Sequence, residues 1–342
     1  MSAFALSKEQ RALILDASPG SELYDPTDVA GPDAARDLFN PEIIGPHLGD
    51  CDAMAAYTIP KDLVKRAPRL RWLHCMAAGL DYVLKTGMFD EAGIVLTNTS
   101  GASAAMIGEY ILMSMLLYSH QHHVSLRAQV RHEWTPISRF FSRADSLRGK
   151  TLGVIGYGAI GREAARLALA FGMEVMALKR DPQVRRDPRF SFPDVGDPEG
   201  RIPARWFGPE QCAELMALSD FIAVSLPLTA ATRNFIGARE LAAARPGAYL
   251  VNVGRGEVID QNALIQALAN GPLGGAGLDV MVPEPLPRDN PLWDMENVIL
   301  TPHTAGPNKR YQDDCIRIFV ENLRRFASGR EMINLVDIRR GY

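Results

Sequence analysis

The chain has 342 residues, of which 47% are hydrophobic and 23% charged, and its formal net charge is -3. This length predicts two domains, and this composition excludes an intrinsically disordered chain in favour of a soluble globular protein. The slight negative charge excludes a general attraction for nucleic acid or for an anionic membrane surface, so we expect neither as a partner.

The cysteine spacing and the amino terminus indicate the cellular compartment. Cys51, Cys75, Cys212 and Cys315 form no CxxC pair, which predicts reduced thiols without a disulfide or a zinc site. The first residues contain no basic segment followed by an apolar stretch and a cleavage site. We therefore expect a cytoplasmic protein.

Short apolar runs separated by helix-like stretches fill the first hundred residues. The runs that we interpret as strands are Ala12–Leu15, Ala53–Tyr57, Leu70–Cys75 and Gly93–Thr97. Apolar strands that alternate with helical patterns favour a parallel α/β architecture.

A long apolar segment, 102–118, comes next. A glycine and a glutamate interrupt it, and a polar SHQHH stretch follows it, so it is too short and too polar to span a membrane. We predict a buried helix at a domain or subunit interface. His120 and His123 would share one face of a helix while His122 would not, and no carboxylate is near in sequence, so we expect no metal site there.

A second α/β series follows an arginine-rich connector, 127–148. Its six predicted strands are Thr151–Ile155, Glu174–Leu178, Phe221–Ser225, Ala248–Val253, Gly275–Asp279 and Val298–Leu300. The spacing predicts a helix over 161–171, an extended loop over 183–209, and an amphipathic helix over 311–327. Six strands with helical connections are what a dinucleotide-binding domain requires.

A glycine-rich turn joins the first strand of this series to its helix. The segment Gly156-Tyr-Gly-Ala-Ile-Gly161 has the GxGxxG spacing. In that motif the first glycine allows a tight turn, the second lets the backbone approach a pyrophosphate, and the third lets the helix pack closely on the strand. Because a strand pattern precedes the motif and a helix pattern follows it, the sequence predicts a dinucleotide site here.

The residues after the next strand bear on which dinucleotide binds. An acidic residue at this position would bind the ribose hydroxyls of NAD, but Lys179 and Arg180 stand there. Two cations suit the 2′-phosphate of NADP. Asp181 follows directly and could approach the ribose instead. We expect NADP as the cofactor, with NAD as the alternative.

Three further motifs each follow an apolar strand. They are VNVGRGEVID with Arg255, LDVMVPEPLP with Asp279 and Glu284, and NVILTPHTAG with His303. Because open α/β sheets bind ligands at the carboxyl ends of their strands, we expect these side chains to lie at one site.

Together with GYGAIG, SLPLT, NPLW and the MAAGLD stretch at 76–81, these motifs resemble the D-2-hydroxyacid dehydrogenase family, in family order and from about Leu70 onward. The resemblance implies two Rossmann-like α/β domains, each with a doubly wound parallel sheet, and a cleft between them. Residues 1–101 and 302–342 would bind substrate, and residues 102–301 would bind NAD(P).

The family's functional roles can be carried over to matching residues. His303 would be the general acid or base, oriented by Glu284, and Arg255 would bind the substrate. The backbone N–H groups of Ala78 and Gly79 would hold the substrate carboxylate. The residues that the resemblance places at the cofactor are Gly156, Tyr157, Gly158, Ala159, Ile160, Gly161, Lys179, Arg180, Leu226, Pro227, Thr232, Val253, Gly254, Asp279, His303 and Gly306.

By this resemblance the chain would reduce a small 2-keto acid to the D-2-hydroxy acid with NAD(P)H, or run the reverse reaction. The Lys179-Arg180 pair resembles that of NADP-using glyoxylate/hydroxypyruvate reductases, which favours those two substrates. Two alternatives remain open: a dehydrogenase of another small anion such as formate or phosphite, and a dinucleotide-sensing scaffold like the related co-repressors. The family's usual homodimer would form through residues 102–148.

Overall fold

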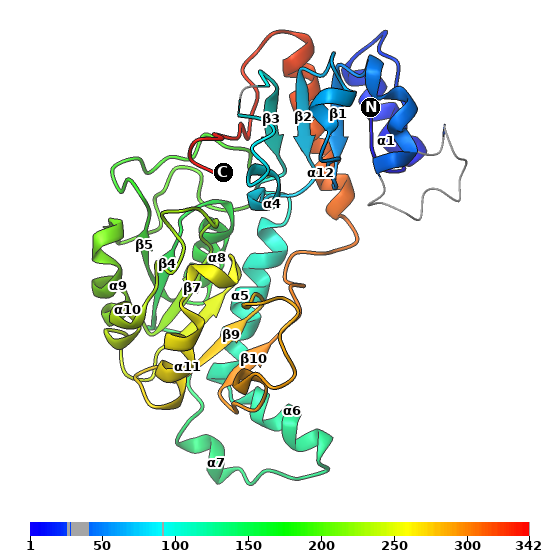
Figure 1. Cartoon of the computed structure of the whole chain (residues 1–342). Helices are drawn as coiled ribbons and strands as arrows, with labels where there is room; N and C mark the ends of the chain where they lie inside the picture. The colour runs from blue at the N-terminus through cyan, green and yellow to red at the C-terminus, as the bar shows by residue number, and fades with distance from the viewer. Residues whose placement is uncertain (26–27, 29–40, 91, 342) are drawn as a thin grey trace. The chain divides into compact units, whose positions relative to one another are not determined.

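The computed structural model describes residues 1–25, 28, 41–90 and 92–341, with the side chains at 41–44 and 46 left aside. The chain forms two compact units (Figure 1). Unit 1 contains Met1–Ala102, Pro188–Phe190 and Asn308–Tyr342, and unit 2 contains Ser103–Asp187 and Ser191–Pro307.

Among its described residues, unit 1 contains a three-stranded parallel sheet in the order β1-β2-β3. Its strands are β1 (Ala53–Ala56), β2 (Trp72–Cys75) and β3 (Val95–Asn98), which confirms three of the four strands expected in this region. All four residues of β2 are buried, as a central strand covered on both faces requires. The smaller elements are η2 (Pro41–Asp50), α3 (Leu63–Arg66) and α4 (Asp81–Leu84).

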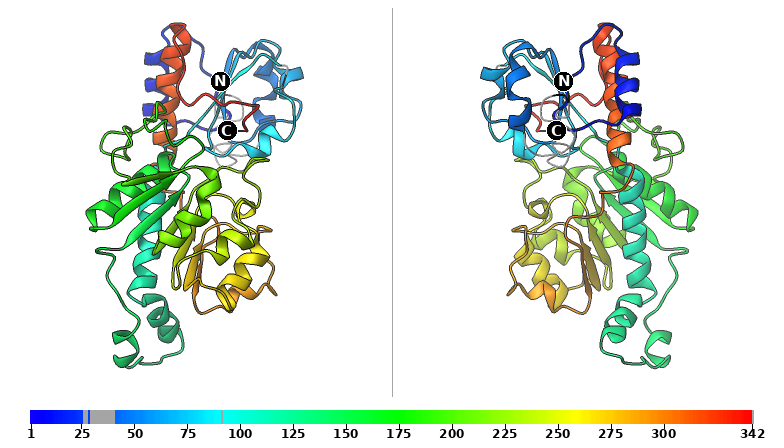
Figure 2. Two further views of the ribbon diagram at one scale, coloured as in Figure 1. Left: turned by 90° about the vertical axis from the view of Figure 1, so that its left-hand side faces the viewer. Right: turned by 90° about the vertical axis from the view of Figure 1, so that its right-hand side faces the viewer.

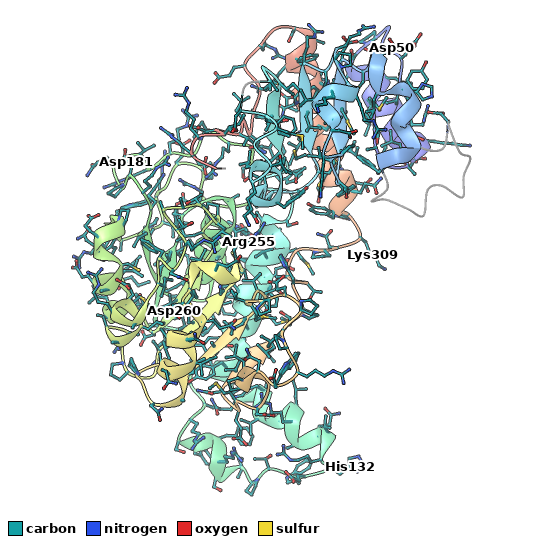
Figure 3. All side chains as sticks on the ribbon, in the orientation of Figure 1. Asp50, His132, Asp181, Arg255, Asp260 and Lys309 are labelled. Atoms are coloured by element: carbon teal, nitrogen blue, oxygen red, sulfur yellow. The ribbon has the colours of Figure 1, made fainter. Side chains whose placement is uncertain are left out.

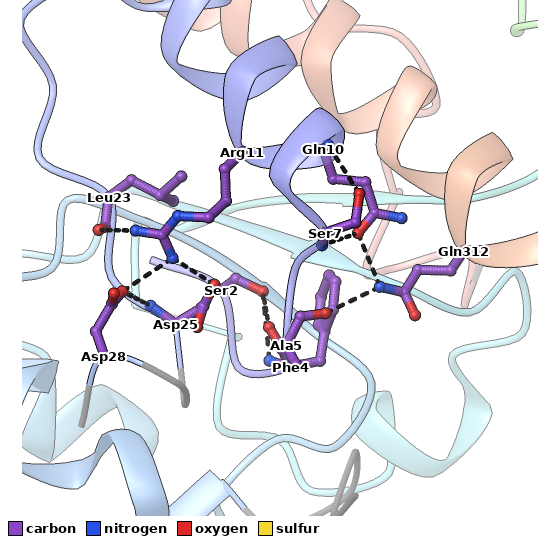
Figure 4. A network of polar contacts seen from close by, with 10 residues as sticks. All are labelled: Ser2, Phe4, Ala5, Ser7, Gln10, Arg11, Leu23, Asp25, Asp28 and Gln312. Carbon is purple, nitrogen blue, oxygen red and sulfur yellow. Dashed lines mark hydrogen bonds and ion pairs between the residues drawn. The ribbon is translucent and has the colours of Figure 1, made fainter. Parts of the chain in front are cut away.

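Two helices from opposite ends of the chain pack together in unit 1, as both views of Figure 2 show: α1 (Lys8–Ala17) and α12 (Tyr311–Ala327). The predicted amphipathic helix over 311–327 is confirmed by α12. Gln312 of α12 donates to the Ala5 carbonyl at 3.0 Å and to the Gln10 side chain at 3.1 Å. Figure 4 shows this network together with the pairing of Arg11 to Asp25 at 2.5 Å.

The expected strand Ala12–Leu15 is wrong, because these residues lie within α1. Ser7 and Gln10 form a capping box at the start of this helix, which satisfies two backbone N–H groups that a helix terminus would leave unpaired. The buried residues Gln10, Ile14 and Ala17 follow the helical period. A run of four apolar residues fits either element, and the polar residues around it decide in favour of the helix.

Unit 2 contains a seven-stranded parallel sheet in the order β10-β9-β8-β7-β4-β5-β6. Its strands are β4 (Thr151–Ile155), β5 (Glu174–Leu178), β6 (Arg205–Phe207), β7 (Phe221–Val224), β8 (Tyr249–Asn252), β9 (Gly275–Leu278) and β10 (Val298–Leu300). All six expected strands are present. Strand β6 was missed, because it has only three residues and lies in the segment that we interpreted as a loop.

Helices cover both faces of this sheet. One core joins the sheet to α5 (Ala104–Ser119) and α8 (Ala159–Ala170), and a second core joins it to α9 (Cys212–Leu218), α10 (Ala238–Ala242) and α11 (Gln261–Ala269). The predicted helices over 102–118 and 161–171 correspond to α5 and α8. The short 3-10 elements are η3 (Pro209–Gln211), η4 (Gly256–Val258) and η5 (Pro291–Trp293).

Two short helices follow α5, namely α6 (His122–Val130) and α7 (Ser138–Phe141). Within the described part of the chain, no helix is both long and apolar enough to cross a membrane. All four cysteines are buried, and none of them forms a disulfide in this structure.

Candidate active site

The carboxyl edge of the unit 2 sheet is where the predicted site residues of this unit gather. Strand β4 lies between β5 and β7, so the chain reverses its direction of winding at β4. In doubly wound sheets, a ligand crevice forms at such a reversal, outside the carboxyl ends of the strands.

The glycine loop leaves β4 and enters α8 with very little space around its backbone. Gly156 has a φ of +101°, which favours glycine, and a Cβ there would lie 3.0 Å from the carbonyl carbon of Ser225. A Cβ on Gly161 would lie 2.3 Å from the Gly156 carbonyl oxygen. The first turn of α8 can therefore approach β4 only because this residue is glycine. The helix N-terminus that results is a favourable place for a pyrophosphate, so the loop fits a dinucleotide.

The remaining residues of the loop are placed by the same turn. Gly158 precedes the helix in an extended conformation, and Ala159 and Ile160 form its first turn. The side chain of Tyr157 is buried and its hydroxyl donates to Asp197 at 2.8 Å. Burial and this neighbouring carboxylate raise the pKa of Tyr157, since both disfavour a phenolate.

The loops after β7 and β8 close around the glycine loop. A Cβ on Gly156 would meet Leu226 at 3.1 Å, and a Cβ on Gly254 would meet the Leu226 carbonyl oxygen at 2.6 Å. Thr232 donates to the Pro227 carbonyl at 2.6 Å, which holds the turn after β7. Val253 is buried and continues β8 by donating to Val224 at 3.0 Å.

The basic residues after β5 lie at the same edge of the sheet. Lys179 is half-buried and its ammonium donates to the Val184 carbonyl oxygen, while Arg180 is exposed. Asp181 accepts a hydrogen bond from the backbone N–H of Gln183 at 3.0 Å. The acidic residue is therefore engaged in a local turn and both cations remain at the end of the strand.

Arg255 follows β8 and is half-buried at the carboxyl edge (Figure 3). Its guanidinium donates to the Gly254 carbonyl at 2.9 Å, and its own carbonyl accepts from the buried side chain of Asn252 at 3.2 Å. A Cβ on the next residue, Gly256, would lie 2.2 Å from the Met281 carbonyl oxygen. The Arg255 loop is thus packed directly against the segment that follows β9.

That segment carries Glu284, which connects to His303. One Glu284 carboxylate oxygen accepts from the Met281 backbone N–H at 3.1 Å, and the other lies 2.8 Å from the Nδ1 of His303. The side chains of His303 and Glu284 are 49% and 36% exposed. A proton on Nδ1, donated to the carboxylate, leaves Nε2 of the imidazole to exchange a proton with a bound molecule.

Asp279 fixes the backbone around His303. It is buried, and its carboxylate accepts from the Thr301 hydroxyl at 2.6 Å and from the N–H groups of Thr304 at 2.8 Å and Ala305 at 3.0 Å. Thr301 is in turn bonded to the Tyr110 hydroxyl at 2.7 Å. The resemblance placed Asp279 among the cofactor residues but did not indicate these hydrogen bonds, although Thr301 and Thr304 stand in the same motif as His303.

The conformation of His303 is itself unusual, because its φ is +57°. Few residues other than glycine adopt this region. The His303 N–H donates to the Asp279 carbonyl at 2.9 Å, and Thr301 before it and Thr304 after it both donate to the Asp279 carboxylate. The loop is therefore held on both sides of the histidine.

The predicted substrate loop lies in unit 1, after β2. Ala78 is exposed and Gly79 half-buried, and the Ala78 carbonyl accepts from the Asn98 side chain at 3.0 Å. Tyr311 of α12 donates to the Met76 carbonyl at 3.0 Å, where the loop begins. Side chains from β3 and α12 thus hold the loop through its carbonyl groups. These contacts do not use the backbone N–H groups that are expected to bind a carboxylate.

Comparison with known proteins bears on these observations. The family described as D-isomer specific 2-hydroxyacid dehydrogenase, NAD binding domain, matches residues 112–305. A glyoxylate/hydroxypyruvate reductase B of Pectobacterium carotovorum subsp. carotovorum (strain PC1) is 33% identical over 281 residues, which cover 82% of each chain.

Two solved structures are similar over the whole chain. A D-isomer specific 2-hydroxyacid dehydrogenase from Xanthobacter autotrophicus Py2, in complex with NADPH and MES, has a TM-score of 0.76 at 26% identity and covers 100% of this chain and 99% of its own. An NADPH-dependent glyoxylate/hydroxypyruvate reductase from Sinorhizobium meliloti, in complex with NADP and sulfate, has a TM-score of 0.75 at 26% identity, with 100% and 98% covered. These matches confirm the family expected from the ordered motifs: the chain belongs to the D-isomer specific 2-hydroxyacid dehydrogenases, a family of NAD(P)-dependent oxidoreductases.

Proposed function

We propose that this protein reduces a small 2-keto acid to the corresponding D-2-hydroxy acid with NADPH. The observation that carries the proposal is the pairing of His303 with Glu284 at 2.8 Å, together with the packing of the Arg255 loop on Met281 beside Glu284. A proton donor, the carboxylate that orients it and a guanidinium thus follow neighbouring strands at one edge of the sheet.

In this proposal each residue has a separate task. The imidazolium form of His303 gives its Nε2 proton to the carbonyl oxygen and becomes the neutral imidazole, while Glu284 accepts from Nδ1–H and stabilises the charged form. Arg255 binds the carboxylate and the carbonyl oxygen of the substrate, because a planar guanidinium matches two oxygens at once. The N–H groups of Ala78 and Gly79 bind the same carboxylate, and Asp279 holds the His303 loop beside the nicotinamide. The cofactor, when bound, supplies the hydride that reaches C2 of the substrate.

Two observations support NADPH over NADH. Lys179 and Arg180 follow β5 where an acidic residue would bind the ribose of NAD. Both solved structures named above contain NADPH or NADP. The glycine loop fits either dinucleotide, so the two cations carry the distinction.

We propose glyoxylate and hydroxypyruvate as the substrates to test first, because the Pectobacterium and Sinorhizobium relatives carry those names. Steady-state reduction of a panel of 2-keto acids should be faster with NADPH than with NADH. His303→Ala should lose most of the rate and still bind NADPH, whereas Lys8→Ala, which changes an exposed side chain of α1 in unit 1, should behave as the wild type. Wild-type protein that reduces no 2-keto acid would refute the activity.

We also propose a homodimer formed through residues 102–148. Large apolar side chains on and around α6 and α7 are exposed, among them Val130 at 84%, Trp134 at 97% and Phe141 at 82%. Exposure of this many apolar groups on one segment is costly in water and marks an interface, and a second copy of this chain is the proposed occupant. Sedimentation should show a dimer for the wild type and a shift toward monomer for Trp134→Ser; a monomeric wild type would contradict the proposal.

A further inference from the structure

The segment after β5 is attached to α8 by a buried arginine. Arg162, in the first turn of α8, has a side chain only 3% exposed. Its guanidinium donates to the Arg185 carbonyl at 2.6 Å and to the Asp197 carbonyl, and lies 3.4 Å from the Asp187 carboxylate. A buried guanidinium needs such partners, because its charge is costly to remove from water otherwise. We call Arg162 with Asp187 and Asp197 the Arg162 clamp.

The Asp197 side chain completes the attachment. Its carboxylate accepts from the Tyr157 hydroxyl at 2.8 Å and from the N–H groups of Arg201 at 2.9 Å and Ile202 at 3.0 Å. Gly200 has a φ of +67°, and a Cβ there would lie 2.5 Å from the Arg185 carbonyl oxygen. The backbone at Arg185 is therefore held from two sides, and the glycine loop is tied to it through Tyr157.

The segment after β5 brings Arg185, a third cation beside Lys179 and Arg180, to the end of this strand. The Lys179 ammonium donates to the carbonyl of Val184, directly before Arg185. The Arg185 guanidinium lies 5.9 Å from the ring centre of Trp206, and that ring packs at 5.0 Å against Tyr157 of the glycine loop. Because the backbone at Arg185 is fixed and its guanidinium already lies against the Trp206 ring, this side chain has less freedom to lose on binding a ligand than an arginine on an unrestrained loop.

We propose that the Arg162 clamp is a positioning device for coenzyme selection, which holds Arg185 so that its guanidinium binds the 2′-phosphate of NADPH. This inference rests on the proposed use of NADPH and adds a residue and its support to Lys179 and Arg180. Arg186 has the same charge, but it is 77% exposed and its carboxylate partner Glu199 lies at 3.4 Å. Because the Arg186 guanidinium pairs with a surface carboxylate, it provides a matched control for Arg185.

The experiment measures dissociation constants of the full-length protein for NADPH and NADH by cofactor fluorescence, with 2′,5′-ADP as a competing probe of the phosphate contact. Arg185→Gln should weaken NADPH and 2′,5′-ADP by about tenfold, as expected for the loss of one charge-assisted contact, and leave NADH within about twofold. Asp197→Asn should weaken the same two ligands, again with NADH little changed. Arg186→Gln should leave the NADPH to NADH ratio as in the wild type.

Two results would overturn the inference: an unchanged ratio in Arg185→Gln, or an equal loss of NADPH and NADH in Asp197→Asn, which would indicate a merely structural clamp. If Asp197→Asn does not fold, Arg185→Gln decides alone, because its side chain is exposed. Binding is measured without turnover, so a wild type that prefers NADPH yet reduces no 2-keto acid refutes the proposed activity and not this inference. A wild type that prefers NADH overturns both the coenzyme proposal and the clamp's role.

Discussion

A completely buried histidine gives unit 1 a dependence on pH that can be worked out from its surroundings. His74 in β2 has 0% exposure, and its Nδ1 lies 2.7 Å from the Thr97 hydroxyl. Among the residues that the structure describes, its Nε2 has no hydrogen-bond partner. Burial lowers the pKa of His74 to about 3, because the imidazolium would lose its hydration. We predict that mild acid destabilises this unit through His74.

The direction and size of the effect follow from proton linkage. A histidine in an unfolded chain has a pKa of about 6.5, so between pH 6.5 and 3 the unfolded state binds a proton that the folded state does not. The stabilisation from neutral His74 is complete above pH 6.5 and is lost as the pH falls toward 3. One proton gives a slope of about 1.4 kcal/mol per pH unit, so the free energy of unfolding should fall by about 2 kcal/mol between pH 7.5 and 5.

The assay is urea unfolding at several pH values, followed by tryptophan fluorescence. Trp72 is the one tryptophan of unit 1, and its indole N–H donates to the same Thr97 hydroxyl at 2.8 Å. His74→Gln is the matched variant, because it keeps a polar partner for Thr97 and cannot titrate in this range. Subtracting its pH dependence from that of the wild type isolates the contribution of His74. Equal slopes for the two proteins would refute the reasoning.

Three further predictions concern unit 2. Asp279→Asn places an amide N–H against the backbone N–H of Ala305, where the carboxylate accepts a hydrogen bond of 3.0 Å. The loss of one charge-assisted hydrogen bond in a buried site costs about 2 kcal/mol, so kcat/KM should fall about thirtyfold while the NADPH dissociation constant changes little. Unchanged kinetics would show that the His303 loop does not need this carboxylate. Gly161→Ala would put its Cβ 2.3 Å from the Gly156 carbonyl oxygen, so titration should show that NADPH binding is lost, whereas Gly49→Ala, which meets no atom within 4 Å, should bind normally. Arg255→Lys should raise the KM for the 2-keto acid at least tenfold, since an ammonium cannot pair with two oxygens in one plane; steady-state rates with a KM like that of the wild type would argue against Arg255 as the substrate ligand.

The strand ends and the glycine loop could be predicted from the sequence, because each is a local pattern. An apolar strand followed by GxGxxG and a helical period specifies β4, the turn and α8 within one short stretch. Because their motifs each follow an apolar strand, Arg255, Glu284 and His303 were likewise expected at the carboxyl edge of the sheet. The error over Ala12–Leu15 arose where four apolar residues fit two elements and the helix start had to be recognised from Ser7 and Gln10.

Other features depend on residues that are distant in sequence. Arg162 and Asp197 are 35 positions apart in the sequence, and no local pattern relates them. The sequence therefore predicts a loop between β5 and β7, although the backbone of this segment is hydrogen-bonded to α8. Strand β6 is formed by pairing with β5, in which Trp206 lies opposite Ala177. This pairing depends on tertiary structure and not on a local sequence pattern. The resemblance placed Asp279 at the cofactor, but its hydrogen bonds to the backbone of Thr304 and Ala305 connect the ends of two different strands and have no signature in a local sequence pattern.

These contacts explain how exposed side chains can have fixed positions at this edge. Backbone segments approach so closely at Gly161, Gly254 and Gly256 that a Cβ would lie less than 3.0 Å from a carbonyl oxygen, so the loops are held by their main chains. The left-handed conformation of His303 carries a cost of order 1 kcal/mol. The three hydrogen bonds accepted by Asp279 offset that cost. Because the backbone is held by Asp279 and the imidazole by Glu284, the ring needs no burial to be oriented, and nearly half of it remains available to a substrate.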